Sequence, residues 1–524
     1  MFKEGSMKKQ RISAFEPKVF ILGIILSVFS AIICMQIIAK VGFTPNTSII
    51  GAIVAMVLAK IPLQYLSGFK SLERQNLIQT TVSAAGFSSA NCTFLACAIF
   101  FVLGKEEMIF PMAIGSAIGV VVSIVIVGKL YDTPVFPASA AWPPGVATAD
   151  AIIAGDQGGD KGKRLLEGLI VGAVASHFGL PAAGIGIVFI SNIFSMVALG
   201  VGLLIRGYSE QLFGFNLGNT YIPHGVMIGA GLMALIQSIL IISKSDKKTK
   251  TENNENIKTT VSASQTKKVI LVAIIVYLIS SLALAAVSGI ITNMGVSQLI
   301  LWVLWTTFSA VVAMILVGMA AMHSGWFPAF AITTIFMTIG MFMGFEVVPL
   351  ALLTGFVSSV GPCFADMGYD LKTGWILRGK SEDIEYELYG RKQQVIIEAV
   401  GGLIGVVVVA LTMSVYFNQD LMPPVSRVFA TTVQAQADTE LIKTLLIWAI
   451  PGFIIQAISG SSRMVGVLFA TGLLINNPVY GIGVILAVIV RLAIGTEFME
   501  TRDAGLIAGD GIYGFIAGLI NSIF

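Results

Sequence analysis

The stretch from Thr133 to Arg164 reads TPVFPASAAWPPGVATADAIIAGDQGGDKGKR and lies between two long apolar runs. Its four prolines prevent a continuous helix, because proline lacks the backbone N–H and clashes with the preceding turn. The residues GVATADAII, from Gly145 onward, are mostly small and have helical spacing. In a membrane, irregular backbone is tolerated only inside protein or along a water-filled cavity. The stretch therefore predicts an interrupted or re-entrant segment with a short helix that begins near Gly145.

The composition indicates a polytopic membrane protein. The chain has 524 residues, of which 56% are hydrophobic and only 12% charged, whereas a soluble domain has about 25% charged residues. The net charge of +3 gives no reason to expect nucleic acid as a partner. The four cysteines form no Cys-x-x-Cys pair and the three histidines are scattered. We therefore predict no cofactor and no metal site.

Apolar runs along the chain predict the membrane segments, since a spanning helix needs about 20 residues. The first part offers 19–41, 47–66, 76–103, 108–130, 165–205 and 223–243. The second offers 269–291, 297–322, 327–343, 347–364, 394–417, 441–459, 462–475, 479–495 and 503–523. We expect helix breaks near Gly86 and near Gly179 and Pro181. The fold class expected is an all-α polytopic membrane protein with about 14–16 membrane segments, in two repeated halves with broken or re-entrant helices.

Charge predicts the division of the chain and its orientation. Residues 243–268 hold seven lysines and three acids without an apolar cluster, and residues 1–18 hold five Lys/Arg. By the positive-inside rule both segments are cytoplasmic, although Arg206 and Arg502 do not fit this scheme neatly. We predict a first transmembrane half at 1–242, a cytoplasmic linker at 243–268 and a second half at 269–524. The protein is expected to be multi-pass in the cytoplasmic membrane, with a cytoplasmic N-terminus.

A weak internal repeat supports two halves. Pro143-Pro144 recurs as Pro423-Pro424, and glycines at 225, 229 and 231 recur at 505, 509 and 511 with the same offset. Two-fold repeats with paired broken helices are typical of secondary transporters. The free N–H groups at the start of each proline-led helix would suit a carboxylate.

Polar residues inside apolar runs are candidate functional residues, because a charge at a helix centre costs about 2.5–3.5 kcal/mol on insertion scales. The stretch LERQNLIQTTVSAAG places a polar stripe on one helix face, namely Glu73, Asn76, Gln79 and Thr80. The alternative for this stripe is an interfacial helix start. In CFADMGYDLKTGWILRG, Asp366 and Asp370 share a helical face, followed by Lys372 and Thr373. Neighbouring buried carboxylates resist full ionisation, which suits proton coupling, and the alternative is a membrane-surface cluster. Asp510 is a third candidate, with a structural hydrogen bond as its alternative.

These stretches resemble the oligopeptide transporter (OPT) family, whose relatives include the yellow stripe-like metal–chelate carriers. The resemblance rests on LERQNLIQTTVSAAG, FPASAAWPPGVATADAI, DLKTGWILRGKSEDIEYELYGRKQQ and AGLIAGDGIYG, in the family's order. The AAWPPG portion departs from the family pattern, as does the acidic insert at 381–388. The resemblance implies a prokaryotic member that carries short peptides or metal chelates with protons, through up to 16 spans. The residues that carry the family pattern are Glu73, Asn76, Gln79, Thr80, Gly145, Thr148, Asp370, Lys372 and Thr373.

Together these observations predict a secondary active transporter, a proton-coupled symporter that imports oligopeptides, and not an enzyme. The predicted substrate-binding residues are Glu73, Asn76, Gln79, Thr80, Pro144, Gly145, Thr148, Lys372 and Thr373. The predicted proton-coupling residues are Asp366, Asp370 and Asp510. The alternatives are uptake of metal–chelate complexes, a passive channel, or an integral membrane enzyme, which would need an acid beside one of the histidines. The expected partners are the substrate, protons and the lipid bilayer, and a homo-oligomer stays open.

Overall fold

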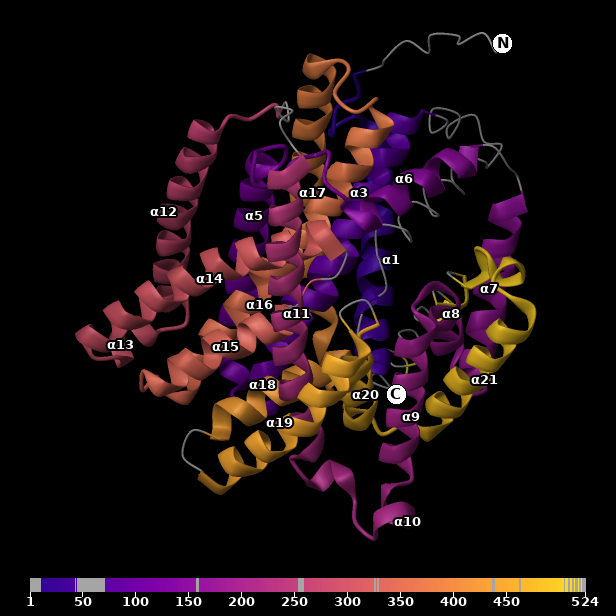
Figure 1. Cartoon of the computed structure of the whole chain (residues 1–524), viewed down its shortest axis with the longest axis vertical. Helices are drawn as coiled ribbons and strands as arrows, with labels where there is room; N and C mark the ends of the chain where they lie inside the picture. The colour runs from indigo at the N-terminus through magenta and orange to yellow at the C-terminus, as the bar shows by residue number, and fades with distance from the viewer. Residues whose placement is uncertain are drawn as a thin grey trace.

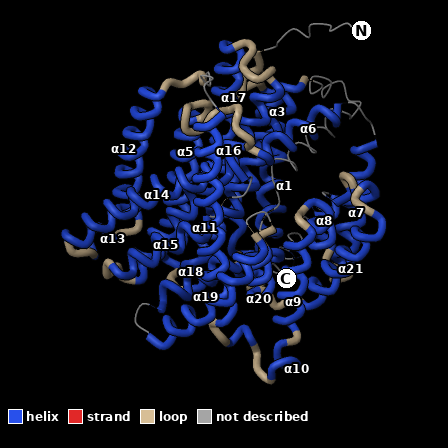
Figure 2. The backbone as a smooth tube through the Cα atoms, viewed as in Figure 1, coloured by secondary structure: helices blue, strands red, loops and turns tan. Residues whose placement is uncertain are grey.

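The chain is built from helices, as predicted, and no β-strand occurs in its described ranges (Figures 1 and 2). The computed structural model describes residues 11–42, 71–156, 160–252, 259–324, 329–435, 439–460 and 463–503, with single residues beside and after these ranges. The predicted run 47–66 and much of 503–523 lie outside the described residues.

The longer elements follow the apolar runs of the sequence. The first part contains α1 (Pro17–Val41), α3 (Leu72–Phe87), the π-helical segment η2 (Ser88–Phe94), α4 (Leu95–Val102), α5 (Ile109–Leu130), α6 (Pro143–Asp156), α7 (Asp160–His177), α8 (Ala182–Ile190), α9 (Ile193–Gly207), α10 (Ser209–Phe213), η4 (Leu217–Asn219) and α11 (Ile222–Glu252). The second part contains α12 (Ala263–Val287), α13 (Ile290–Asn293), α14 (Val296–Ser324), α15 (Ala329–Phe342), α16 (Val347–Leu377), α17 (Ile384–Phe417), α18 (Pro424–Gln434), α19 (Thr439–Ser459), α20 (Val465–Leu474) and α21 (Pro478–Ile494). Helices α11 and α12 both reach into the predicted linker 243–268.

The lengths of these helices confirm a polytopic membrane protein. Within the described residues, 8 helices are long and apolar enough to cross a membrane, and further apolar helices of 10–17 residues accompany them. The break predicted near Gly179 and Pro181 is confirmed, because α7 ends at His177 and α8 begins at Ala182. A second break follows at residues 191–192. The shorter apolar helices of the predicted run 165–205 are thus parts of an interrupted path.

The break predicted near Gly86 is wrong. Helix continues from Leu72 to Val102, with a π-helical turn in η2 directly after Phe87. No proline interrupts the backbone here, so the helix can continue. The Ser88 hydroxyl also donates to the Gly402 carbonyl of α17 at 2.7 Å, which ties this part of the helix to its neighbour. A π turn shifts the helix face by one residue without unpairing the chain, and such turns are frequent at functional sites.

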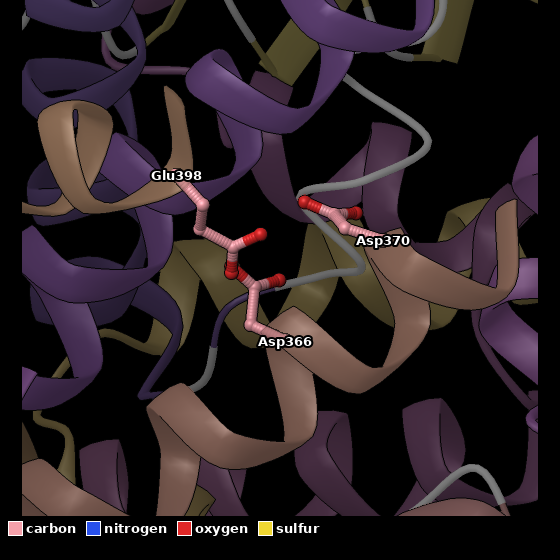
Figure 3. A group of neighbouring side chains, drawn as sticks. All are labelled: Asp366, Asp370 and Glu398. Carbon is pink, nitrogen blue, oxygen red and sulfur yellow. The ribbon is translucent and has the colours of Figure 1, made fainter. Parts of the chain in front are cut away.

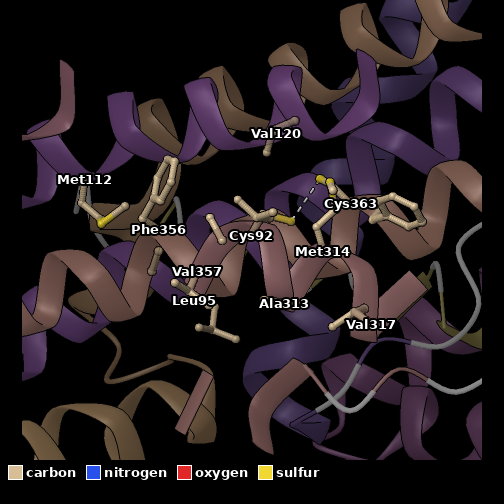
Figure 4. Packing of buried hydrophobic residues seen from close by; sticks show 14 of the residues in the cluster. Cys92, Leu95, Met112, Val120, Ala313, Met314, Val317, Phe356, Val357 and Cys363 are labelled. Carbon is tan, nitrogen blue, oxygen red and sulfur yellow. Dashed lines mark hydrogen bonds between the residues drawn. The ribbon is translucent and has the colours of Figure 1, made fainter. Parts of the chain in front are cut away.

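Helix α16 forms the axis of the bundle, because every residue from Pro349 to Gly374 is buried. Its 31 residues correspond to a length of roughly 46 Å. It packs on α3, η2, α5, α14 and α17, and the Cys363 thiol lies 3.3 Å from Cys92 of η2 (Figure 4). Pro362 interrupts the hydrogen bonding inside α16, so the helix is weakened one turn before Asp366.

The two proline-led helices dock at different levels of α16. The start of α6 lies against residues 368–373, where an added Cβ at Gly145 would lie 2.5 Å from the Tyr369 carbonyl oxygen. The start of α18 lies nearer the N-terminal end of α16, where Val425 of α18 and Pro362 of α16 line the same cavity. Asp366 therefore lies on α16 between these two contacts, and Asp370 lies at the level of the start of α6.

Candidate functional site

Three carboxylates meet inside the bundle. Asp366 and Asp370 of α16 and Glu398 of α17 bring oxygen atoms within 4.8 Å of one another (Figure 3). Their exposed fractions are 3%, 0% and 1%, so the alternative of a membrane-surface cluster is wrong for Asp366 and Asp370. The i, i+4 spacing on one helix face is confirmed, and we call the three residues the carboxylate triad.

Polar groups of α3 support this triad. The Gln79 Nε2 donates to Asp370 Oδ1 at 2.6 Å, and the Ser83 hydroxyl donates to Asp366 Oδ1 at 3.0 Å. Glu398 is less well supported, because its Oε2 is buried and has no hydrogen-bond partner among the described residues. Buried carboxylates at this spacing repel one another when ionised. Such a set of oxygen atoms can take up a proton or a hard cation.

Gln394 of α17 connects the predicted polar stripe to the triad. Its Nε2 donates to the Asp370 carbonyl oxygen at 2.8 Å, to Thr80 Oγ1 at 3.1 Å and, more weakly, to Asn76 Oδ1 at 3.4 Å. Asn76, Gln79 and Thr80 are fully buried, so they belong to the interior and not to an interfacial helix start. Glu73 begins the stripe, where it accepts a hydrogen bond from the Tyr386 hydroxyl at 3.0 Å.

Lys372 and Thr373 hold the proline-containing segment before α6, and the start of α6, on α16. The Lys372 Nζ donates to the Ala138 and Ala140 carbonyl oxygens, at 2.8 Å each, and lies 4.4 Å from the centre of the Trp375 ring. The Thr373 hydroxyl donates to the Gly145 carbonyl oxygen at 3.0 Å. The charged Lys372 ammonium group is thus hydrogen-bonded to backbone carbonyls of the segment 138–140.

The start of α6 differs from the anion receptor expected from its sequence. Pro143 and Pro144 have no N–H group, and the Gly145 and Val146 amides both donate to the Trp142 carbonyl oxygen. The first four residues of α6 therefore have no N–H left for a ligand. The Thr148 hydroxyl likewise donates to the Pro144 carbonyl oxygen within the helix.

Asp510 is not brought together with Asp366 and Asp370. Its Oδ1 lies 3.4 Å from the Lys40 Nζ at the end of α1, and its side chain is 3% exposed. The residue thus forms an ion pair at another place in the bundle.

A buried ion-pair network fixes the end of α16 to the start of α17. Arg378 and Glu387 form a two-pronged pair at 2.7 and 3.2 Å, and both side chains are 0% exposed. Arg391 approaches Glu387 at 3.3 Å and Asp132 at 3.5 Å, and it lies over the Tyr131 ring. Burial, reinforced by the Glu387 carboxylate, raises the pKa of Tyr131 well above its usual range. The positive charges of Arg378 and Arg391 are thus compensated by the negative charges of Glu387 and Asp132.

A small cavity reaches α16 at Pro362, one helical turn before Asp366. It has a volume of about 140 Å³, which is less than the 300–1,000 Å³ of typical ligand pockets. Its wall includes Asn91 of η2, Ser358 and Pro362 of α16 and Val425 of α18. The irregular helical segments η2, α16 at Pro362 and the start of α18 therefore meet at one internal space.

Sequence reasoning missed Glu398 and Gln394. Both lie in or beside the apolar run 394–417, where a lone acidic residue was a signal that could have identified Glu398. The signal for Gln394 was its place at the end of the stretch DLKTGWILRGKSEDIEYELYGRKQQ, which resembles the OPT family.

Comparison with known proteins identifies the family. The chain matches the family model described as OPT oligopeptide transporter protein over residues 15–240 and 214–521. A search of curated proteins found no match. Because the family model covers nearly the whole chain, the protein belongs to the OPT oligopeptide transporter family, which is a family of transporters and not of enzymes.

Proposed function

We propose that this multi-pass transporter is a proton-coupled symporter that imports oligopeptides. The observation that carries the proposal is the carboxylate triad, buried inside the bundle on α16 and α17. As in the sequence-based prediction, we assign proton coupling to Asp366 and Asp370, and we now add Glu398. Asp510 was also predicted to couple protons, and in this proposal it could do so only through its ion pair with Lys40.

The electrostatics of the triad support coupling to protons. Two ionised carboxylates within 4.8 Å of each other repel by at least about 3.5 kcal/mol at an effective dielectric constant of 20. A proton entering down a membrane potential of 100 mV supplies about 2.3 kcal/mol. Because the two energies are of similar size, uptake of one proton can change which arrangement of the helices is favoured.

The irregular helices supply places where the bundle can bend. The cavity beside η2 and Pro362 has only about 140 Å³, so a peptide enters only if the walls separate. Helix irregularities such as π turns and internal prolines are common hinge points. We propose that α18 borders the route on one side of the triad and α6 closes it on the other.

The predicted substrate residues fall into two groups in this proposal. Glu73, Asn76, Gln79 and Thr80 provide a polar wall that leads to the triad. Lys372 and Thr373 act as positioning residues, because their contacts hold the segment of Pro144, Gly145 and Thr148 against α16.

We further propose that the protein lies in the cytoplasmic membrane with a cytoplasmic N-terminus. The lysine-rich segments at 1–18 and 243–268 support this orientation through the positive-inside rule. The same charge pattern supports the division into halves at 1–242 and 269–524.

Uptake by proteoliposomes under an imposed pH gradient tests the proposed function. Labelled di- to tetrapeptides are compared with an iron chelate, which tests the alternative cargo. The variant Asp370→Asn should lose at least tenfold in gradient-driven accumulation while it inserts normally, and the exposed control Glu106→Gln should behave as wild type. Normal concentrative uptake by Asp370→Asn would remove this residue from the mechanism.

A further inference from the structure

A second, larger pocket opens at the end of the bundle where α1 ends. It has a volume of about 380 Å³ and lies among the ends of α1, α9 and α20 and the starts of α11 and α18. Helix α10, which follows Arg206 closely in the chain, lies at the far end of the molecule from the N-terminus (Figure 1). This volume falls within the usual range of ligand pockets, about 300–1,000 Å³.

The wall of this pocket is positively charged. Lys40, Arg206 and Arg427 reach it from three different elements, against one carboxylate, Asp420. Cations are not expected at this end under the proposed orientation, because lysine and arginine accumulate on the cytoplasmic side. The positive-inside rule therefore does not explain why an arginine stands at position 206, and a functional role would explain it.

Arg206 is held in place through Asn216, whose side-chain amide also donates to the Glu210 carboxylate at 3.0 Å, so Glu210 offsets part of the Arg206 charge without a direct ion pair. Its Nη1 donates to Asn216 Oδ1 at 2.7 Å, and Asn216 Oδ1 also accepts from the Gly218 amide at 2.8 Å. The guanidinium lies so close over Gly218 that any side chain there would overlap it. Arg427 is paired with Asp420 at 2.8 Å and Lys40 with Asp510 at 3.4 Å. Within the described part of the chain, Arg206 forms no ion pair.

The charged pocket adjoins the small internal cavity. Lys40 lines the pocket while Ile38 and Gly42, its neighbours on α1, line the cavity. Pro424 lines the pocket and Val425, the next residue of α18, lines the cavity. The two spaces thus share the end of α1 and the start of α18 as a common wall.

We infer that this pocket is the outer vestibule of the transporter, in which Arg206 binds a carboxylate of the substrate before it enters the bundle. A guanidinium presents two parallel N–H groups that match a carboxylate. The inference rests on the proposed function. It adds the chemical group of the substrate that the protein recognises, which is a carboxylate. The carboxylate belongs either to the C-terminus of a peptide or to an iron chelate, and the two sources are separated by experiment.

The test compares two forms of one probe, labelled trialanine with a free C-terminal carboxylate and its C-terminal amide. Ferric nitrilotriacetate forms the chelate arm. Uptake by proteoliposomes and calorimetric binding to the purified full-length protein are measured for wild type, Arg206→Gln and Arg206→Lys. Arg11→Gln, which removes an exposed positive charge at the opposite end, is the matched control.

We expect Arg206→Gln to raise the half-saturating concentration of a carboxylate probe at least tenfold, with a smaller change in Arg206→Lys and none in Arg11→Gln. The amide should bind wild type as weakly as trialanine binds Arg206→Gln. A response confined to trialanine or to ferric nitrilotriacetate supports the inference and identifies the carboxylate source. If Arg206→Gln does not fold, Arg206→Lys carries the test, and unchanged binding of both carboxylate probes to this variant would overturn the inference.

Equal affinity of wild type for trialanine and its amide, with unchanged binding of the chelate to Arg206→Gln, would overturn the inference. Absence of binding of both carboxylate probes to wild type would overturn it as well. Failure of the proposed function gives a different pattern, since the probes would then bind in an Arg206-dependent manner without gradient-driven accumulation.

Discussion

Replacing Glu387 by glutamine should destabilise the protein by several kcal/mol. Glu387 accepts two hydrogen bonds from Arg378, and Arg391 contacts the same carboxylate. The change Glu387→Gln leaves two buried arginines opposite one remaining carboxylate, Asp132. Hydrogen bonds to charged groups contribute about 1.5–3 kcal/mol each, and removal of one partner of a buried pair costs about 3–5 kcal/mol. We expect a loss of about 3–5 kcal/mol in the free energy of unfolding.

Equilibrium unfolding of the detergent-purified protein measures this loss, with Glu385→Gln as the control. Glu385 lies in the same first turn of α17, but its side chain is 87% exposed and pairs with Arg11, and an exposed pair is worth at most about 1 kcal/mol. The double variant Glu387→Leu/Arg378→Met should recover most of the loss, since Arg391 then remains opposite Asp132. Equal losses in Glu387→Gln and Glu385→Gln would refute the reasoning.

Two further changes probe the contacts of the triad and of α6. Gly145→Ala places a methyl group 2.5 Å from the Tyr369 carbonyl oxygen, so we expect a loss of about 1–3 kcal/mol in stability and slower peptide uptake. Gly295→Ala, where an added Cβ meets nothing within 4 Å, should be neutral, and similar uptake by both would contradict the role of this contact. Glu398→Gln should reduce gradient-driven accumulation at least tenfold but preserve exchange of labelled for unlabelled peptide, and unchanged accumulation would exclude Glu398 from coupling.

Periodicity within one helix was predictable from sequence, whereas contacts between helices were not. The four-residue spacing of Asp366 and Asp370 indicated a shared face, and the structure confirms it. Glu398 joins them from α17, and no pattern inside a single helix shows which residue of another helix will lie opposite. A lone acid in an apolar run marks a candidate, but its partners come only from the tertiary fold.

The start of α6 shows why a local motif can mislead. Two prolines followed by small residues indicate a helix start, and this part of the prediction is confirmed. Free N–H groups are expected at any helix start, and the sequence does not show that the Trp142 carbonyl accepts them here. In the structure Trp142 has a left-handed φ of 41°, and its ring packs so closely on Gly368 that a Cβ there would overlap it. This conformation places the Trp142 carbonyl over the helix start, where it accepts the available amides.

The spacing of charges in the bundle gives a physical reason for symport in the proposed mechanism. In the proposed mechanism, the peptide amine reaches the triad after the substrate has left Arg206 and entered the bundle. With the triad fully ionised, all three carboxylate pairs repel, by at least about 3.5 kcal/mol for each pair within 4.8 Å. The substrate amine or a proton alone compensates one charge and leaves one repelling pair. Together they leave a single ionised carboxylate, which has no neighbour to repel it, so the loaded carrier is favoured only when both positive charges are bound.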